Sequence, residues 1–353
     1  CSNMKNITEQ IQKILNEIHG IAKKENISTA FVIGNTVGGD GKKIRFFPIR
    51  KTSSIVFGVL NIYSIEEAKK ATNFIDGKVD FIFVDVEKKQ NFVNDLENAL
   101  RKVVKKSEVF SIKLNDMTVD AADALISQFF GNVYGKKVAI LGVGNLGSKI
   151  AIKMVERGAN VSISRRDVEK ARKIADGINI IKNKYSKSVV TAFSDNYEAS
   201  KGSDVVIGCT PRTPVITKKM VANMKQGSCI IDVGIGTIFP DAIELANKRG
   251  IDILRLDMRS GFSGGITTVI ETDEMLKNIT GKRDISGVNI VAGGYIGKKG
   301  DIIVDRISNP TKIIGVADGV GGILPDSGEF KDRLQKLRTI IEGKKPDGEQ
   351  SSP

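Results

Sequence analysis

The segment Lys136–Asp167 restricts the fold of this chain more than any other part of it. An apolar run, 137–142, is followed by three glycines in the spacing GxGxxG, then by a helical pattern and a second apolar run, 160–164. In a strand–turn–helix unit the first glycine permits the tight turn, the second lets a pyrophosphate approach the backbone, and the third allows close helix–strand packing. We therefore predict that a dinucleotide binds at Gly142, Gly144, Asn145, Leu146 and Gly147.

The residues after the second predicted strand indicate which dinucleotide would bind. An NAD site usually has a carboxylate here, because it accepts hydrogen bonds from the ribose hydroxyls. This chain instead has Ser164, Arg165 and Arg166, a hydroxyl and two guanidinium groups suited to a 2′-phosphate. Asp167 is expected to cap the following helix. The sequence therefore predicts NADP as the cofactor; the alternative is that one or both arginines are simply solvated.

The strand and helix pattern continues as a doubly wound sheet. Six strands are predicted, with helical segments between most of them: 137–142, 160–164, 188–193, 204–208, 228–233 and 252–256. Ligands of such sheets bind outside the carboxyl ends of the strands. Thr210 and Pro211 follow the fourth strand and Gly234 follows the fifth, so we expect them to contact the ribose and nicotinamide.

The remaining sequence lies on both sides of this predicted Rossmann domain, residues 136–258. Residues 1–116 are expected to form an N-terminal α/β substrate domain, joined by a linking helix at 117–135. Residues 259–343 are expected to contain a glycine-rich loop with a short helix, a β-hairpin within 288–307 and a final helix, which complete the cleft or make a dimer contact. Residues 344–353 are expected to be a disordered tail. The predicted fold class is α/β.

Composition and charge argue against several other classes of protein. The formal net charge of +13 suits anionic ligands, but the lysines are scattered and no arginine-rich arm is present, so we expect no nucleic-acid partner. No apolar run approaches the roughly 18 residues that a membrane span needs, so no membrane partner is expected. His19 is the only histidine, which argues against histidine-based catalysis, and no metal site is predicted.

The cysteines are expected to be structural. Cys209 and Cys229 lie in or beside apolar runs and are predicted to be buried, reduced thiols of a cytoplasmic protein. Met4 is the expected natural start of the chain, with a lipid-modified Cys1 as the alternative.

Three stretches of the predicted Rossmann domain resemble known families. Glutamyl-tRNA reductases and methylene-tetrahydrofolate dehydrogenases have segments similar to DVVIGCTPRTPVITKKMV and GSCIIDVG. The NADP loop of shikimate dehydrogenases is similar to VSISRRDVEKARKIA, and all three families resemble GKKVAILGVGNLG after a linking helix. The resemblance covers about Met117 to Asp257 and identifies the superfamily, not one member. It implies a separate N-terminal α/β substrate domain and an active site in the cleft between the two domains.

The chain departs from these families at the catalytic residues. Past Cys1 the N-terminal region lacks the nucleophilic cysteine of glutamyl-tRNA reductases, and the signatures of the folate enzymes are not recognisable. Shikimate dehydrogenases use a Lys and an Asp as an acid–base pair. The nearest matches are Lys51, in FFPIRKTSS, and Asp120, in MTVDAAD, although the family's neighbouring Asn and Gly are absent. The resemblance therefore implies Lys51 and Asp120 as the proton-transfer pair.

The expected function combines these features. Arg259 follows the sixth strand and could hold a carboxylate substrate through its planar guanidinium. We expect an NADP-dependent dehydrogenase or reductase that transfers a hydride to or from a small anionic metabolite at a hydroxyl/carbonyl carbon, and that forms a homodimer. Two alternatives stay open. One is a methylene-tetrahydrofolate- or pterin-type dehydrogenase, in which no hydroxyl proton moves; the other is a non-catalytic NADP-binding regulatory protein.

Overall fold

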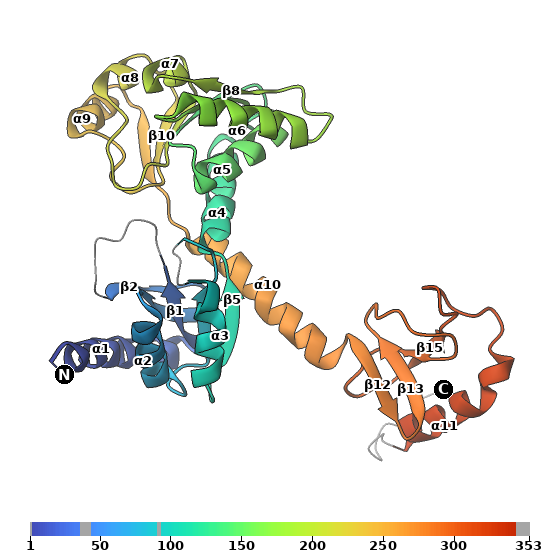
Figure 1. Cartoon of the computed structure of the whole chain (residues 1–353). Coiled ribbons are helices and arrows are strands. Elements are labelled where there is room, and N and C mark those ends of the chain that lie inside the picture. The colour runs from blue at the N-terminus through green and yellow to red at the C-terminus, as the bar shows by residue number, and fades with distance from the viewer. Residues whose placement is uncertain (1, 36–43, 90–92, 344–353) are drawn as a thin grey trace. The chain divides into compact units, whose positions relative to one another are not determined.

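The computed structural model describes residues 2–35, 44–89 and 93–343 (Figure 1). The chain divides into two compact units, residues 1–266 and 267–353. Helices pack on parallel or mixed sheets in both, so the predicted α/β class is confirmed. Cys1 and the tail expected at 344–353 lie outside the described residues.

The N-terminal sheet of the larger unit has five strands in the order β2-β3-β1-β4-β5, all parallel except β2. The strands are β1 (Ser28–Gly34), β2 (Arg45–Lys51), β3 (Ile55–Asn61), β4 (Phe81–Asp85) and β5 (Glu108–Ile112), and the helices are α1 (Ser2–Glu25), α2 (Ile65–Ile75) and α3 (Val93–Val103). Pro48 has no N–H for a strand ladder, which is tolerated because β2 is an edge strand whose register shifts between Phe47 and Arg50. In α1, Ile11, Leu15 and Ile18 recur at helical spacing and are fully buried in the core of this sheet.

All six strands predicted for the Rossmann domain form one parallel sheet, in the order β11-β10-β9-β6-β7-β8. The strands are β6 (Lys137–Leu141), β7 (Asn160–Ser164), β8 (Val190–Phe193), β9 (Val205–Gly208), β10 (Cys229–Asp232) and β11 (Asp252–Arg255). The helices are α5 (Asn145–Glu156), α6 (Val168–Ile181), α7 (Asn196–Ser200), α8 (Lys218–Ala222) and α9 (Pro240–Lys248). The chain moves outward from β6 to β8 and then returns to place β9 on the other side of β6. That reversal makes the β6/β9 edge a topological switch point, where ligands of such sheets bind.

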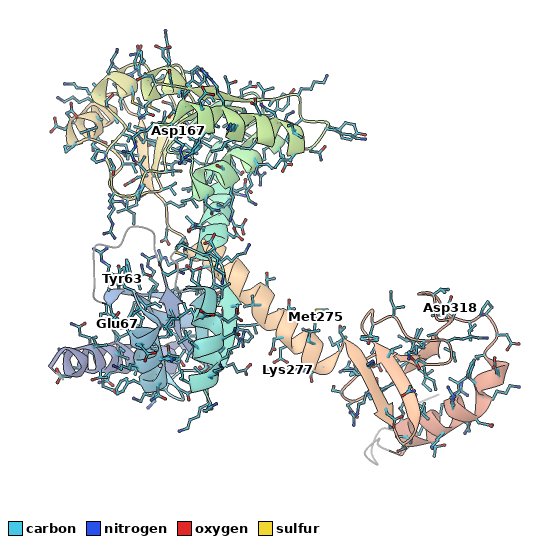
Figure 2. The ribbon with its side chains drawn as sticks, viewed as in Figure 1. Tyr63, Glu67, Asp167, Met275, Lys277 and Asp318 are labelled. Atoms are coloured by element: carbon cyan, nitrogen blue, oxygen red, sulfur yellow. The ribbon has the colours of Figure 1, made fainter. Side chains whose placement is uncertain are left out.

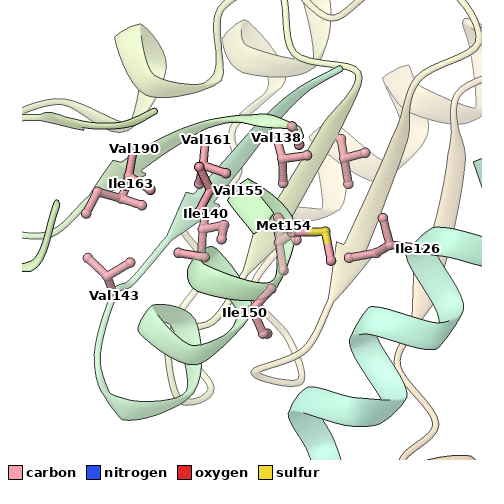
Figure 3. Packing of buried hydrophobic residues seen from close by; sticks show 14 of the residues in the cluster. Ile126, Val138, Ile140, Val143, Ile150, Met154, Val155, Val161, Ile163 and Val190 are labelled. Atoms are coloured by element: carbon pink, nitrogen blue, oxygen red, sulfur yellow. The ribbon is translucent and has the colours of Figure 1, made fainter. Parts of the chain in front are cut away.

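The core of this sheet determines where the glycine turn lies. Ile140 of β6 and Ile163 of β7 are fully buried against Ile150 and Met154 of α5, as Figure 3 shows. Burying each such side chain contributes about 1.5–3 kcal/mol, so the β6–turn–α5 unit is firmly positioned.

Residues 259–278 differ from the prediction of a glycine-rich loop and short helix, because they form one continuous helix, α10 (Arg259–Asn278). Two of its glycines, Gly261 and Gly265, pack against α4 (Leu114–Phe130), the predicted linking helix. A Cβ on Gly261 would lie 1.9 Å from the carbonyl oxygen of Met117, and one on Gly265 would lie 2.3 Å from Cε of Met117. The glycines that suggested a loop therefore allow α10 to approach α4 closely. A residue with a side chain at these positions would prevent that approach.

The smaller unit contains a four-stranded sheet, β12-β13-β14-β15, whose core includes residues of α11 (Lys331–Glu342). The strands are β12 (Gly281–Ile285), β13 (Val288–Ala292), β14 (Ile302–Val304) and β15 (Ile313–Val316), and a single 3-10 turn, η1 (Gly328–Phe330), precedes α11. The predicted hairpin within 288–307 is wrong, because β13 and β14 are parallel. The hairpin joins β12 to β13 through Ser286 and Gly287, whose φ angles of 52° and 81° are those of a tight two-residue turn.

The contact between α4 and α10 can be tested with two neighbouring glycines. We expect Gly261→Ala to lower the free energy of unfolding by about 1–3 kcal/mol, because the new methyl group must displace the α4 backbone. Gly264→Ala is the matched control: no atom lies within 4 Å of its Cβ position, so helix propensity should leave stability equal or up to about 1 kcal/mol higher. Urea unfolding followed by circular dichroism measures both, and equal effects would contradict the contact.

Candidate functional site

The turn between β6 and α5 needs glycine at two of its positions because of backbone crowding. Gly142 has a φ of 95°, and a Cβ there would lie 3.0 Å from the backbone nitrogen of Thr210. A Cβ on Gly147 would lie 2.8 Å from the carbonyl oxygen of Gly142. The first and third glycines therefore serve the tight turn and the helix–strand packing that the sequence predicts.

Gly144 differs from these two because the space beside it is open. It is the N-cap of α5, no described side chain caps the helix there, and a Cβ would meet nothing within 4 Å. The first N–H groups of a helix have no partner within the helix, and the helix dipole favours an anion at this end. The opening beside Gly144 therefore suits the approach of a phosphate to the backbone.

The side chains of Asn145 and Leu146 make contacts within the protein. Asn145 Oδ1 accepts a hydrogen bond of 3.2 Å from Asn115 Nδ2, and Leu146 packs against the Rossmann core. Leu146 can therefore offer a ligand only its backbone N–H group, whereas Asn145 can offer its backbone N–H group and its side-chain Nδ2.

A cavity of about 500 Å³ opens at the switch point, lined by the glycine turn, the end of β7, the start of α6 and the loop after β9. Arg165 Nη1 donates to the carbonyl oxygen of Val143 at 3.1 Å, which holds the guanidinium beside the glycine turn. Arg166 and Lys170 also line the cavity and are exposed. Sequence reasoning missed Lys170, although its place in the first turn of α6, after a capping Asp167, is a signal that could have found it. Three cations thus line this cavity.

Ser164 and Asp167, at the carboxyl end of β7, already form hydrogen bonds within the protein. Ser164 lines the cavity; it is buried and its Oγ donates to Asn196 Oδ1 at 2.6 Å, so its hydroxyl proton is already used in a hydrogen bond. Asp167, which is labelled in Figure 2, accepts a hydrogen bond at Oδ1 from the backbone N–H of Lys170 at 3.1 Å, and its Oδ2 lies 3.4 Å from Lys170 Nζ. That backbone hydrogen bond holds the pKa of Asp167 below its usual value. Asp167 is the one carboxylate among the described residues lining this cavity, and it caps α6 as predicted.

Thr210, Pro211 and Gly234 lie where two loops cross the carboxyl edge of the sheet. A Cβ on Gly234 would lie 1.9 Å from the carbonyl oxygen of Thr210, and Arg212 N donates to the carbonyl oxygen of Gly234 at 3.1 Å. Thr210 Oγ1 donates to the carbonyl oxygen of Thr213 at 2.7 Å. Thr210 and Pro211 line the cavity beside the glycine turn. Gly234 instead allows the two loops to come into contact.

Sequence reasoning also missed Asp232, the residue that shapes the second of these loops. Its buried carboxylate accepts from the N–H groups of Gly236 and Thr237 at 2.9 and 3.1 Å, and from Thr237 Oγ1 at 2.8 Å. These bonds hold the pKa of Asp232 low although burial raises it. They also fix Ile235 at a φ of 60°, which a β-branched residue rarely adopts and which carries strain. Ile235 is thereby held as a rigid, half-exposed apolar wall.

Ile235 belongs to a second cavity, of about 240 Å³, between the carboxyl ends of β1 and β3 and the start of α10. Its apolar lining includes Phe57 and Phe262, whose rings stack with centroids 4.3 Å apart. Its charged and amide groups are Asn35, Asn61, Arg50 and Arg259. Arg50 is half-buried and forms no ion pair with a described residue. We refer to this space as the cleft cavity; its lining suits a small anion with an apolar body.

Asn35 connects the cleft cavity to a buried ion pair. Its Nδ2 donates to the carbonyl oxygen of Asp85 at 3.0 Å, while its Oδ1 is buried without a hydrogen-bond partner. Asp85 is fully buried and lies 2.7 Å from Lys89 Nζ. Burial raises the pKa of Asp85, and Lys89 opposes that effect. An unsatisfied amide oxygen beside a cavity is a place where a ligand hydroxyl could donate.

The structure does not bring Lys51 and Asp120 together. Lys51 Nζ lies 2.6 Å from Glu25 Oε2, and Asp120 Oδ1 lies 2.9 Å from Lys153 Nζ. Arg259 lines the cleft cavity at the start of α10, and its Nε donates to Asp257 Oδ2 at 2.7 Å. Of the residues predicted for substrate chemistry, Arg259 lies in this cavity and the other two do not line it.

Several further properties of the described residues bear on the chemistry. Burial raises the pKa of Cys209 and of Cys229 to about 12, so both thiols stay protonated. No group of three or more His, Cys, Asp or Glu in the described part of the chain could hold a metal ion. None of its helices combines the length and apolar character needed to cross a membrane.

Comparison with known proteins is consistent with this geometry. Residues 137–236 match the family described as NADP oxidoreductase coenzyme F420-dependent. A glutamyl-tRNA reductase of Thermosipho melanesiensis is 30% identical over 104 residues, 30% of this chain and 26% of the relative. A glycerol-3-phosphate dehydrogenase [NAD(P)+] of Clostridium botulinum is 31% identical over 209 residues, 52% of this chain and 61% of the relative. The chain thus spans less than two thirds of either relative.

Among solved structures, a shikimate dehydrogenase in complex with NADP+ is 12% identical, with 69% of this chain and 96% of that chain covered and a TM-score of 0.40. The resemblance stated from the sequence is confirmed at the level of a Rossmann-type NAD(P)-binding domain with glutamyl-tRNA reductase among its relatives.

The ion pair behind Asn35 yields a stability prediction. Lys89→Met should lower the free energy of unfolding by about 3–5 kcal/mol, because it leaves the Asp85 carboxylate buried without its cation. Adding Asp85→Asn should recover much of that loss. The loss in free energy of unfolding caused by Lys89→Met should become smaller as the pH falls, because the raised pKa lets Asp85 take up a proton and lose its charge.

The control for this pair is Lys69→Met, which breaks an exposed ion pair with Glu66 and should cost at most about 1 kcal/mol. Denaturant unfolding at neutral and acidic pH measures all three variants. If the free energy of unfolding that Lys89→Met loses does not change with pH, Lys89 is not the counter-ion of the buried Asp85 carboxylate.

Proposed function

We propose that this protein is an NADP-dependent oxidoreductase that acts on a small anionic metabolite. The observation that carries the proposal is the end of β7, where Arg165, Arg166 and Lys170 line the cavity and its one carboxylate, Asp167, caps a helix. Three cations without a competing free acid favour a 2′-phosphate over the ribose hydroxyls of NAD.

The residues present fit the dinucleotide. The open position at Gly144 and the uncapped N-terminus of α5 would receive the pyrophosphate, and Arg165 and Arg166 would hold the 2′-phosphate. Thr210 and Pro211 line the same cavity and would contact the ribose and nicotinamide. When bound, NADP supplies or accepts the hydride.

The substrate is assigned to the cleft cavity. Arg50 has no ion pair with a described residue, so a substrate carboxylate or phosphate would be its partner, with Arg259 as the second cation. The free Oδ1 of Asn35 would accept a hydrogen bond from the substrate hydroxyl. Asp85 holds the amide of Asn35 in place and forms, with Lys89, the titratable pair behind it. Lys51 and Asp120, whose partners are Glu25 and Lys153, do not line this cavity.

A methylene-type dehydrogenase is the second candidate, and one observation favours it. The described lining of the cleft cavity contains no His, Lys or carboxylate, and a reaction in which no hydroxyl proton moves needs none. Such an enzyme would still use the same cofactor cavity.

Nucleotide binding is the first test of the cofactor assignment. Calorimetry should show NADPH binding at least about tenfold more tightly than NADH, since each charge-assisted hydrogen bond to the 2′-phosphate contributes about 1.5–3 kcal/mol. Arg165→Ala with Arg166→Ala should erase that difference. Arg172→Ala is the matched control, because it removes an exposed arginine of α6 that does not line the cavity. If neither nucleotide binds, the glycine turn is structural only and the oxidoreductase proposal fails.

Turnover is the second test. Reduction of NADP+ should be followed with shikimate, quinate and sn-glycerol 3-phosphate, and in parallel with methylene-tetrahydrofolate. With whichever hydroxy compound reacts, Arg50→Gln should raise KM about tenfold or more with a smaller effect on kcat, because it removes a charged contact to the substrate anion. Arg45→Gln, on the same strand but outside the cavity, should leave KM unchanged.

Turnover of methylene-tetrahydrofolate alone would favour the second candidate. NADPH binding without turnover of any of these compounds would indicate a regulatory protein.

A further inference from the structure

The smaller unit contains a cavity that the proposed oxidoreductase chemistry does not use. It has a volume of about 370 Å³ and lies between the β12–β13 hairpin and the loop that follows β13. Both belong to the same unit, and Figure 1 shows β12 and β13 side by side there. A cavity of this size can enclose a small-molecule ligand.

The loop that forms one wall is held by hydrogen bonds and close packing. Gly293, Gly294 and Gly300 adopt φ angles of 61°, 81° and 92°, which favour glycine. Gly300 N donates to the carbonyl oxygen of Ala317 at 3.0 Å, and Thr280 Oγ1 donates to that of Gly293 at 3.0 Å. A Cβ on Gly297 would lie 3.0 Å from Val291. The loop therefore holds its side chains in place before any ligand arrives.

The lining of the cavity includes an aromatic ring and cationic groups from both the hairpin and the loop. Tyr295 is 42% exposed, and Lys282 Nζ lies 5.8 Å from the centroid of its ring. Lys298 also lines the cavity. Neither lysine forms an ion pair with a described residue, so both ammonium groups are available to an anion.

The same walls also have hydrogen-bond acceptors: Asp284 lies two residues after Lys282 on β12, on the same face, and Asp301 lies beside Lys298. Asp284 and Asn289 are directly paired across the hairpin and so share one face of it. Asp284 Oδ1 accepts from Gly287 N, and Asp301 Oδ2 accepts from Lys298 N, which leaves each carboxylate a second oxygen. Two carboxylates would repel a bare inorganic anion but would bind hydroxyl donors.

We propose that this cavity binds a nucleoside monophosphate. Its phosphate would lie between Lys282 and Lys298, its base would stack on Tyr295, and its ribose hydroxyls would donate to Asp284 and Asp301. The amide of Asn289 can donate to or accept from the edge of the base. Lys282 and Lys298 would each donate a charge-assisted hydrogen bond to the phosphate.

The test is calorimetry on the full chain with AMP, GMP, CMP and UMP, each titrated separately. At least one should bind, and Lys282→Ala with Lys298→Ala should weaken that binding about tenfold or more. Tyr295→Leu should weaken it by about fivefold or more through the lost stacking. The thermal unfolding temperature of each variant should equal that of the original chain, because these side chains are exposed.

Two control variants separate this site from the proposed cofactor site. Lys299→Ala removes a neighbouring lysine that pairs with Glu329 and does not line the cavity, so it should leave affinity unchanged. Arg165→Ala with Arg166→Ala should also leave it unchanged, so that failure of the NADP proposal and failure of this one remain distinguishable. The proposal is wrong if none of the four nucleotides binds, if binding depends on Arg165 and Arg166, or if inorganic phosphate binds equally well.

Discussion

The main-chain contact between the glycine turn and the end of β7 is the constraint on which the candidate cofactor site depends. The carbonyl oxygen of Ser164 accepts hydrogen bonds from Gly142 N at 3.0 Å and from Val143 N at 3.3 Å. These bonds place the uncapped start of α5 and the loop bearing Arg165 and Arg166 around one cavity. The buried strands of the Rossmann core hold both sides of the contact rigidly, so the cavity exists before a ligand enters it.

Electrostatics distinguishes residues that serve the fold from residues that can serve a ligand. Lys149 pairs with Asp116 and lies 3.4 Å from Glu87, and Arg157 pairs with Asp123, so these cations are satisfied within the chain. Arg50 is instead half-buried with no ion pair to a described residue. Arg259 and, to a smaller extent, Arg50 lower the pKa of Asp257; because that carboxylate pairs with Arg259, the guanidinium of Arg50 can still donate to a ligand anion.

Sequence reasoning worked where one local pattern decides the structure. The six Rossmann strands, the glycine turn and the cap at Asp167 each depend on neighbouring residues, and all are present as predicted. It failed where the deciding contact is distant in sequence. Gly261 suggested a loop because its partner, Met117, lies far away along the chain. Asn35, Arg50 and Asp85 were missed for the same reason, since no motif marks side chains that only the folded sheet brings together.

The arginines after β7 have an evolutionary consequence. The turn that positions a dinucleotide relies on the Ser164 carbonyl and on glycines, that is, on the main chain. The NADP preference that we propose would rest instead on side chains, of which Arg166 is exposed and Arg165 makes one hydrogen bond to a carbonyl oxygen. Exposed positions of this kind usually change stability by less than about 0.5 kcal/mol when substituted. One or two substitutions at these positions could therefore change the nucleotide that the protein uses, from NADP to NAD or the reverse. Such a change would need no compensating substitutions in the core.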